Sequence, residues 1–183
     1  MKLRIAFLSL AALLGVASTA AAQQGADFWS TPAIKGIGPV HAWPEATLKP
    51  DAATTYKAIF DITKAGNDTA INAGLSHVAR VINSFAAAGV PLDHLHFALV
   101  IHGPATPAAL DAKTFEAKFH HPNPNLDVLA KLKKAGVRLL VCGNALGDWH
   151  YTPADVNPNF EVAWSALSTL IILQDQGYAV LAM

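Results

Sequence analysis

The chain contains a single cysteine, so no disulfide and no dithiol motif can form within it. Cys142 is that cysteine among 183 residues, which excludes a C-x-x-C exchange site. No G-x-S-x-G elbow, P-loop or G-x-G-x-x-G fingerprint occurs either, and Gly36-Ile37-Gly38 lacks the further glycine that the last motif requires. We therefore expect no cofactor, and any chemistry is expected to centre on Cys142.

Charged residues are also scarce, at 14% of the sequence with a formal net charge of zero. Nucleic-acid binding needs clustered Lys and Arg side chains. The nearest cluster is formed by Lys131, Lys133 and Lys134, at an expected helix end where cations are favourable for structural reasons. The composition therefore argues against a nucleic-acid partner.

Only one apolar run bears on targeting, and it lies at the start of the chain. A positively charged start precedes the apolar stretch 5–16, and an A-x-A cleavage motif occupies residues 20–22 before Gln23. This run is too short for a comfortable membrane span. We therefore predict a signal peptide at residues 1–22, and a periplasmic protein with no membrane contact after cleavage.

Residues 23–55 differ from the rest of the chain because prolines and glycines interrupt them and no period is sustained. We predict an irregular, extended N-terminal segment there. It carries Trp29, His41 and Trp43, and we expect these aromatic residues to pack on the domain or on a neighbouring subunit.

From Tyr56 onwards, strand-like runs alternate with helical periods. Strands are expected at 56–63, 96–101, 137–141 and 178–183, and helices at about 71–88, 106–119, 123–135 and 160–176. This order predicts a three-layer α/β/α domain over residues 56–183 with a mostly parallel sheet. The last helix is apolar on more than one side, which favours a place in an oligomer interface over a place inside the domain.

Polar residues stand where three of the expected strands end. Asp61 and Thr63 close the first strand, His102 follows the second, and Cys142 follows the third. Ligands of open parallel sheets bind beyond the carboxyl ends of the strands. We therefore expect these residues to converge there, although Asp61 is also a residue type common in turns.

The sequence around Cys142 predicts a strand that passes through a tight turn into a short helix. Backbone N–H groups at a helix N-terminus favour a thiolate, and here Gly143 and Asn144 would supply them. A nearby imidazole, His102 first and His150 next, would favour the thiolate further. The alternative is an inert buried thiol, since free cysteine often packs as a small apolar residue.

Several segments in this order resemble the DsrE/DsrF-like family, the fold of sulfur-relay proteins. They are YKAIFDIT, INAGLSHVARVINSFAAAGV, HFALVIHGPAT, NPNLDVLAKLKKAGVRLLVCGNAL and SALSTLIILQDQGYAVLAM. The resemblance covers residues 56–183, and the preceding segment is similar to that of exported members. It implies a compact three-layer α/β domain that assembles into a homo-oligomer, with a trimer favoured over related rings.

The resemblance also bears on the site. In the relay members that this chain resembles, a cysteine just after a strand carries a persulfide, and Cys142 occupies the matching position. His102 and Gly103 form a strand-end HG motif like that of the exported branch. Relay members are cytoplasmic, however, and many have an Arg-Gly pair after the cysteine, where this chain has Gly147-Asp148-Trp149.

Three functions stay open at this point, and the sequence does not decide whether the protein is an enzyme. In the first, Cys142 carries sulfane sulfur as a persulfide, assisted by His102, between a sulfur donor and an acceptor protein. In the second, Cys142, His102 and His150 bind copper or zinc. In the third, the fold is a non-catalytic ligand-binding or assembly module. Residues expected to contact a ligand are Asp61, Thr63, Gly103, Gly143 and Asn144.

Overall fold

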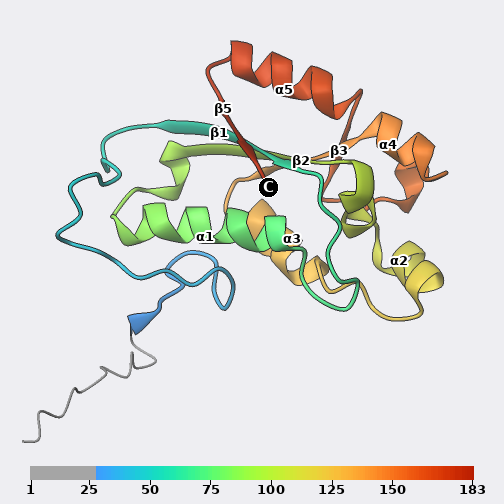
Figure 1. The fold of residues 1–183 in the computed structure, drawn as a ribbon, viewed down its shortest axis with the longest axis horizontal. Helices are drawn as coiled ribbons and strands as arrows, with labels where there is room; N and C mark the ends of the chain where they lie inside the picture. The colour runs from blue at the N-terminus through green and yellow to red at the C-terminus, as the bar shows by residue number, and fades with distance from the viewer. Residues whose placement is uncertain (1–27) are drawn as a thin grey trace, which may run out of the picture.

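The computed structural model describes residues 28–183 and arranges them as a five-stranded sheet between helices (Figure 1). The predicted signal peptide lies outside the described residues. The strands are β1 (Tyr56–Ile62), β2 (Leu95–Ile101), β3 (Arg138–Cys142), β4 (Glu161–Ala163) and β5 (Ala179–Ala182). The α-helices are α1 (Ala73–Ala87), α2 (Ala112–Phe119), α3 (Leu126–Lys134), α4 (Gly143–Asp148) and α5 (Ala166–Asp175). Short 3₁₀ helices are η2 (Leu92–His94), η3 (Gly103–Ala109) and η4 (Pro153–Asp155).

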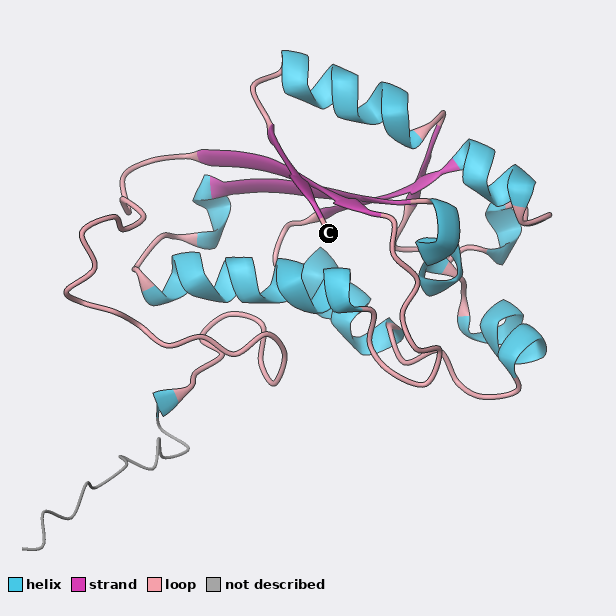
Figure 2. Cartoon of the chain, viewed as in Figure 1, coloured by secondary structure: helices cyan, strands magenta, loops and turns pink. Residues whose placement is uncertain are grey.

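The strand order is β4-β3-β2-β1-β5, and every neighbouring pair is parallel. Figure 2 shows α1 and α3 below the sheet and α5 above it, while α2 and α4 lie at one end. The predicted three-layer α/β/α fold is therefore confirmed. Within residues 28–183, no helix combines the length and the apolar character needed to cross a membrane.

The helices below the sheet follow the sequence signals that predicted them. Asn72 caps α1 by accepting a hydrogen bond from the N–H of Gly74, and the helix buries Leu75, Val78 and Ile82 at spacings of three and four residues. Helix α3 begins at Leu126, later than the start predicted at residue 123. The Asn123 carboxamide still accepts the N–H of Asn125 at 2.9 Å, so it stabilises the turn that leads into α3.

Both faces of the sheet are covered, and successive residues of each strand alternate between them. The larger core lies between the sheet and α1 and α3. The smaller core lies under α5 and contains Ile59 of β1, Val100 of β2 and Leu140 of β3. Cys142 belongs to this smaller core, which places its side chain on the α5 face of the sheet.

The N-terminal segment is irregular, as predicted, and a single buried side chain joins it to α1. Asn83, fully buried, accepts the N–H groups of Ala33 and Ile34 at 3.0 and 2.8 Å and donates to the carbonyls of Ile37 and Gly38 at 2.8 and 2.9 Å. Ile34 and Ile37 are buried in the larger core. The apolar contact with the domain therefore comes from these isoleucines.

The aromatic residues of this segment pack mainly on one another. Phe28 stacks on His41 with ring centroids 3.6 Å apart, and Trp43 meets the His41 ring edge-on. Trp29 and Trp43 remain 49% and 58% exposed. The tryptophans are thus not the residues that attach the segment to the sheet-and-helix domain.

The prediction of one continuous helix over 160–176 is wrong. Residues Glu161–Ala163 form the edge strand β4, and α5 begins only at Ala166, capped by Ser165, whose hydroxyl accepts the N–H of Ser168 at 3.0 Å. Val162 and Trp164 lie on an edge strand and the link after it, so their apolar character does not mark a helix face. The pairing of β4 with β3 places Ala163 beside Cys142.

Candidate functional site

Cys142 is both the last residue of β3 and the N-cap of α4. Its Sγ accepts a hydrogen bond from the N–H of Ala145 at 3.4 Å and another from the N–H of Ala166 at 3.2 Å. Ala145 belongs to α4 and Ala166 is the first residue of α5. The sulfur therefore lies at the N-termini of two helices at once.

Both polar partners of the sulfur are hydrogen-bond donors. Unpaired N–H groups and the positive end of the helix dipole stabilise an anion, and the thiolate is the nucleophilic form of cysteine. The side chain is only 5% exposed and lies among apolar neighbours, so these two N–H groups are the polar partners of Sγ within residues 28–183. Gly143 and Asn144, predicted as the donors to the sulfur, do not donate to Sγ.

Asp61 and His102 form a close pair at the same edge of the sheet. Asp61 Oδ1 lies 2.7 Å from His102 Nε2, and the two side chains are 20% and 21% exposed. His102 has extended backbone angles, and its N–H donates to the carbonyl of Ile62 at 3.1 Å, so it continues the direction of β2. A carboxylate can only accept, which means that Nε2 carries the proton of this hydrogen bond.

The strand register brings this pair next to Cys142. Val100 faces Leu140 and Ile101 faces Val141, so the next positions along β2 and β3 are His102 and Cys142. Neighbouring strands lie about 4.8 Å apart. Val100 and Leu140 belong to the core under α5, and two residues further on the side chains return to that same face.

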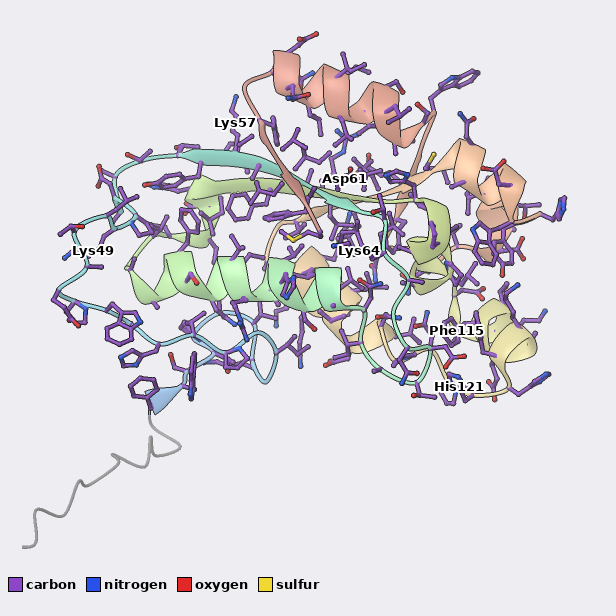
Figure 3. The ribbon with its side chains drawn as sticks, viewed as in Figure 1. Lys49, Lys57, Asp61, Lys64, Phe115 and His121 are labelled. Carbon is purple, nitrogen blue, oxygen red and sulfur yellow. The ribbon has the colours of Figure 1, made fainter. Side chains whose placement is uncertain are left out.

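The same alternation places Asp61 on this face. It stands two residues after Ile59, which belongs to the core under α5. Asp61, His102 and Cys142 therefore follow one another across β1, β2 and β3 at their carboxyl ends. Figure 3 labels Asp61 at the sheet, close to the end of β1.

The other predicted site residues have different surroundings. Thr63 continues beyond β1, and within residues 28–183 its side chain makes no hydrogen bond. The Gly103 carbonyl accepts hydrogen bonds from Thr106 Oγ1 at 2.7 Å and from Trp149 Nε1 at 3.0 Å, so it stabilises the turn after β2. Asn144 is exposed.

An open hollow of about 320 Å³ lies beside the cysteine. It is lined by Gly143, Asn144, Val162, Ala163 and Trp164. A methyl group on Gly143 would lie 3.0 Å from the carbonyl oxygen of Ala163, so only glycine leaves normal space at this wall. Trp164, at 88% exposed, forms the outer side of the hollow.

A second hollow, of about 140 Å³, lies between the loop after β1, η3 and α2, with Phe115, Phe119 and Trp149 among its lining residues. Figure 3 shows Phe115 and His121 close to α2, well apart from Asp61. Among residues 28–183, no cysteine, serine or threonine lines this second hollow.

The copper or zinc set that the sequence left as an alternative is not assembled within residues 28–183. Across residues 28–183, no three His, Cys, Asp or Glu side chains are grouped so as to hold a metal ion. His150 lies in the turn after α4, with a φ of 58°, and is exposed. The histidine that neighbours Cys142 is His102, and it is hydrogen-bonded to a carboxylate.

Sequence reasoning missed two features of the site. One is the contribution of α5 through Ala166, because the helix was expected to begin several residues earlier. Ser165, which stands directly before the mostly apolar helix Ala166–Asp175, is the N-cap signal that could have corrected this. The other is the bond between Asp61 and His102, which depends on the relative positions of β1 and β2 and has no local signal.

These observations define an α/β protein with one thiol at the carboxyl edge of a parallel sheet. The chain belongs to the DsrE/DsrF-like family, whose model matches residues 57–183. A search of curated proteins gives no match.

Solved structures with a related chain path include two bacterial or archaeal proteins. One is a protein of unknown function, MTH1491, from Methanobacterium thermoautotrophicum, with 17% identity, a TM-score of 0.49, and coverage of 70% of this chain and 99% of that chain. The other is the ychN protein from E. coli, with 13% identity, a TM-score of 0.49, and coverage of 70% and 100%.

Proposed function

We propose that the protein carries sulfane sulfur as a persulfide on Cys142 and passes it to an acceptor. The observation that carries the proposal is the pair of N–H groups, from Ala145 and Ala166, that donate to one sulfur atom. Donors of this kind can hold the anionic sulfur that forms when the thiol gives or accepts a sulfur atom. The chain contains no second cysteine that could resolve the persulfide as an internal disulfide.

The loading step is a thiol–persulfide exchange that needs no oxidant. The Cys142 thiolate attacks the outer sulfur of a donor R–S–SH, so that one S–S bond forms and the donor S–S bond breaks. Cys142 then carries –S–SH and the donor leaves as R–S⁻. The same exchange in the opposite direction passes the sulfur to an acceptor thiolate, so a donor or acceptor protein is the expected partner.

The hollow beside the cysteine supports the proposal sterically. Cys142 itself is nearly buried, and the outer sulfur of a persulfide needs space beyond Sγ. The open volume bounded by Gly143, Ala163 and Trp164 adjoins the two residues next to Cys142, along the chain and across the sheet, and is the nearest space that an outer sulfur could enter after a small movement of the side chain. The exposed Asn144 side chain offers a hydrogen-bonding group at the rim.

Mass spectrometry of the intact protein tests the proposal. The purified chain is incubated with polysulfide or thiosulfate and freed of excess donor, in parallel with the Cys142→Ala variant. The wild type should gain the mass of one sulfur atom, and the variant should gain none. Absence of added sulfur with every donor, while the thiol is still free to alkylate after unfolding, would rule the proposal out.

An assembly role is the second candidate, because α5 and β4 expose an apolar face. Val162, Trp164, Leu167, Ile171 and Ile172 are between 45% and 88% exposed. Helix α5 has no charged residue before Asp175, so a partner must also be apolar and neutral there. A second copy of the chain offers a face of that kind, and a homo-oligomer, a trimer foremost, is the assembly proposed.

Light scattering coupled to size-exclusion chromatography tests the assembly. Ile171→Glu should lower the measured mass to that of one chain, because it buries a charge against an apolar surface. Gln174→Glu adds the same charge at an exposed polar position of α5 and should leave the mass unchanged. A wild type that remains one chain at high concentration would exclude this face as a self-association surface.

Export belongs to the same proposal and rests on the charged start, the apolar run and the cleavage motif of residues 1–22. Expression of the full chain in a Gram-negative cell should give a periplasmic product whose N-terminal residue is Gln23. A cytoplasmic product that retains Met1 would overturn it.

A further inference from the structure

We infer that Asp61 is a positioning residue that holds His102 in the tautomer able to exchange a proton with Cys142. This inference rests on the proposed sulfur-carrier function and adds to it the route of the proton. Cys142 alone would need solvent to remove its proton, although the residue is only 5% exposed.

The tautomer follows from the hydrogen bond between the two side chains. Nε2 of His102 donates its proton to Asp61 Oδ1 across 2.7 Å. In a neutral imidazole only one ring nitrogen is protonated, so Nδ1 has a free lone pair. Among residues 28–183 that nitrogen has no hydrogen-bond partner, and Cys142 Sγ is not one either, so the ring and the thiol must move closer before a proton passes between them. The neutral His102 ring is therefore held in the tautomer whose Nδ1 can accept one further proton.

The strand register places Cys142 at the position next to His102, and on this ground we assign its thiol as the proton donor to Nδ1. His102 and Cys142 are level neighbours on β2 and β3, and both side chains lie on the α5 face. Helix α5, which covers that face, carries no ionisable side chain before its last residue, Asp175. A nucleophile, a base and a group that orients the base thus follow one another across three adjacent strands.

The proton balance of sulfur loading then closes within the site. His102 Nδ1 takes the proton of Cys142 Sγ–H, which leaves a thiolate and an imidazolium held by the Asp61 carboxylate. The thiolate attacks the outer sulfur of R–S–SH, forms the Cys142–S–SH bond and expels R–S⁻. The imidazolium returns its proton to R–S⁻, so R–SH leaves and His102 is neutral again.

Alkylation kinetics test the role of Asp61 in the full chain. The second-order rate of Cys142 with iodoacetamide is measured from mildly acid to mildly alkaline pH for the wild type, Asp61→Asn and His102→Gln. Both variants should react roughly tenfold or more slowly at neutral pH, and their rates should recover at alkaline pH. Circular dichroism and thermal unfolding identify any variant that has lost the fold.

The chain supplies a matched control in a second carboxylate–histidine pair. Asp68 Oδ1 lies 3.7 Å from His121 Nε2, beside the other hollow, and Asp68 is 48% exposed. Asp68→Asn therefore removes the same charge at a site that does not adjoin Cys142. Its alkylation rate and pH profile should match those of the wild type.

Nitrogen NMR of the wild type gives a test that does not depend on any variant. The side-chain ¹⁵N shifts of His102 should show a protonated Nε2 and an unprotonated Nδ1 when the ring is neutral. The reverse assignment, or wild-type alkylation by Asp61→Asn, would overturn the inference. If the wild type takes up no sulfur from any donor, the sulfur-carrier function is wrong. The alkylation rates would still show whether Asp61 affects the reactivity of Cys142.

Discussion

Cys142 on β3 and Ala166 at the start of α5 are joined by a hydrogen bond of 3.2 Å across a separation of 24 residues. The contact exists because β4 pairs with β3 and directs the chain back over the end of the neighbouring strand. The thiol is thus held by two separate parts of the chain, α4 and α5. Changes in the link between β4 and α5 should therefore act on Cys142.

Ser165→Ala tests the role of α5 most simply. The Ser165 hydroxyl accepts the N–H of Ser168 and caps the helix whose first N–H donates to Cys142. Loss of the cap should lower the free energy of unfolding by about 1 kcal/mol and slow the alkylation of Cys142. Gln174→Ala, an exposed change near the other end of α5, leaves the cap intact and serves as the control. If Ser165→Ala is less stable but its Cys142 is alkylated at the wild-type rate, the start of α5 does not control the reactivity of the thiol.

Gly143→Ala should disturb the hollow beside the thiol. The added methyl group would lie 3.0 Å from the carbonyl oxygen of Ala163 and 3.4 Å from that of Trp164, so β4 must shift. We expect a loss of about 1–3 kcal/mol in unfolding free energy, as for other overpacked sites, together with a lower yield of persulfide. Chemical denaturation and intact-mass measurements check both effects.

Gly147→Ala is the matched control, because it changes the same residue type in the same helix. No atom lies within 4 Å of the methyl group that it adds. Alanine in place of a helical glycine should stabilise the protein by about 0.5–1 kcal/mol and leave persulfide loading intact. Equal behaviour of the two variants would show that the space at Gly143 is not important.

Asn83→Ala should release the N-terminal segment. It leaves two N–H groups, of Ala33 and Ile34, and two carbonyls, of Ile37 and Gly38, without their buried partner. We expect a loss of about 2–4 kcal/mol, since each unsatisfied buried group costs about 1–3 kcal/mol and some gain water. Limited proteolysis should then cut the segment first. Wild-type stability of Asn83→Ala would contradict the assigned role of this side chain.

Glu161→Gln should have an effect that depends on pH. The hydrogen bond from Arg138 Nη2, 2.7 Å long, holds the pKa of the Glu161 carboxyl below its ordinary value of 4.5, and partial burial opposes this shift. The folded-state pKa is depressed, so the stabilisation is present above the unfolded value and disappears as the pH falls through the folded one.

Both side chains of this pair are about half exposed, so solvent screening keeps its contribution small. The variant should lose under about 1 kcal/mol at neutral pH, and its unfolding curve should merge with that of the wild type in acid. Glu45 forms no ion pair among residues 28–183, so the stability of Glu45→Gln relative to the wild type should not change as the pH falls. A loss that persists below the titration range would exclude the ion pair as its cause.

Periodicity and strand ends predicted much of this fold. The helical period expected at about 71–88 identified α1, and the apolar runs before His102 and Cys142 identified β2 and β3. These signals are local and strong, because a helix or strand buried on one or both faces must show its period in the chain. The convergence of Asp61, His102 and Cys142 at one edge also followed from parallel topology.

Features that depend on pairing between distant segments could not be predicted in this way. Strand β4 has three residues, too few to show a period, and its place in the sheet is decided by its neighbour β3. The partner of His102 depends on the register of β1 against β2. The donors to Cys142 Sγ depend on where α5 begins, which in turn depends on β4.

Cyanolysis of the sulfur-loaded protein tests the central claim most directly. The chain is loaded with polysulfide, freed of donor and treated with cyanide, which attacks the outer sulfur of a persulfide and releases thiocyanate. We predict thiocyanate in an amount equal to the loaded chains, with return of the intact mass to that of the free thiol, and none from Cys142→Ala. Thiocyanate from the wild type no greater than that from the variant would show that Cys142 does not carry sulfane sulfur.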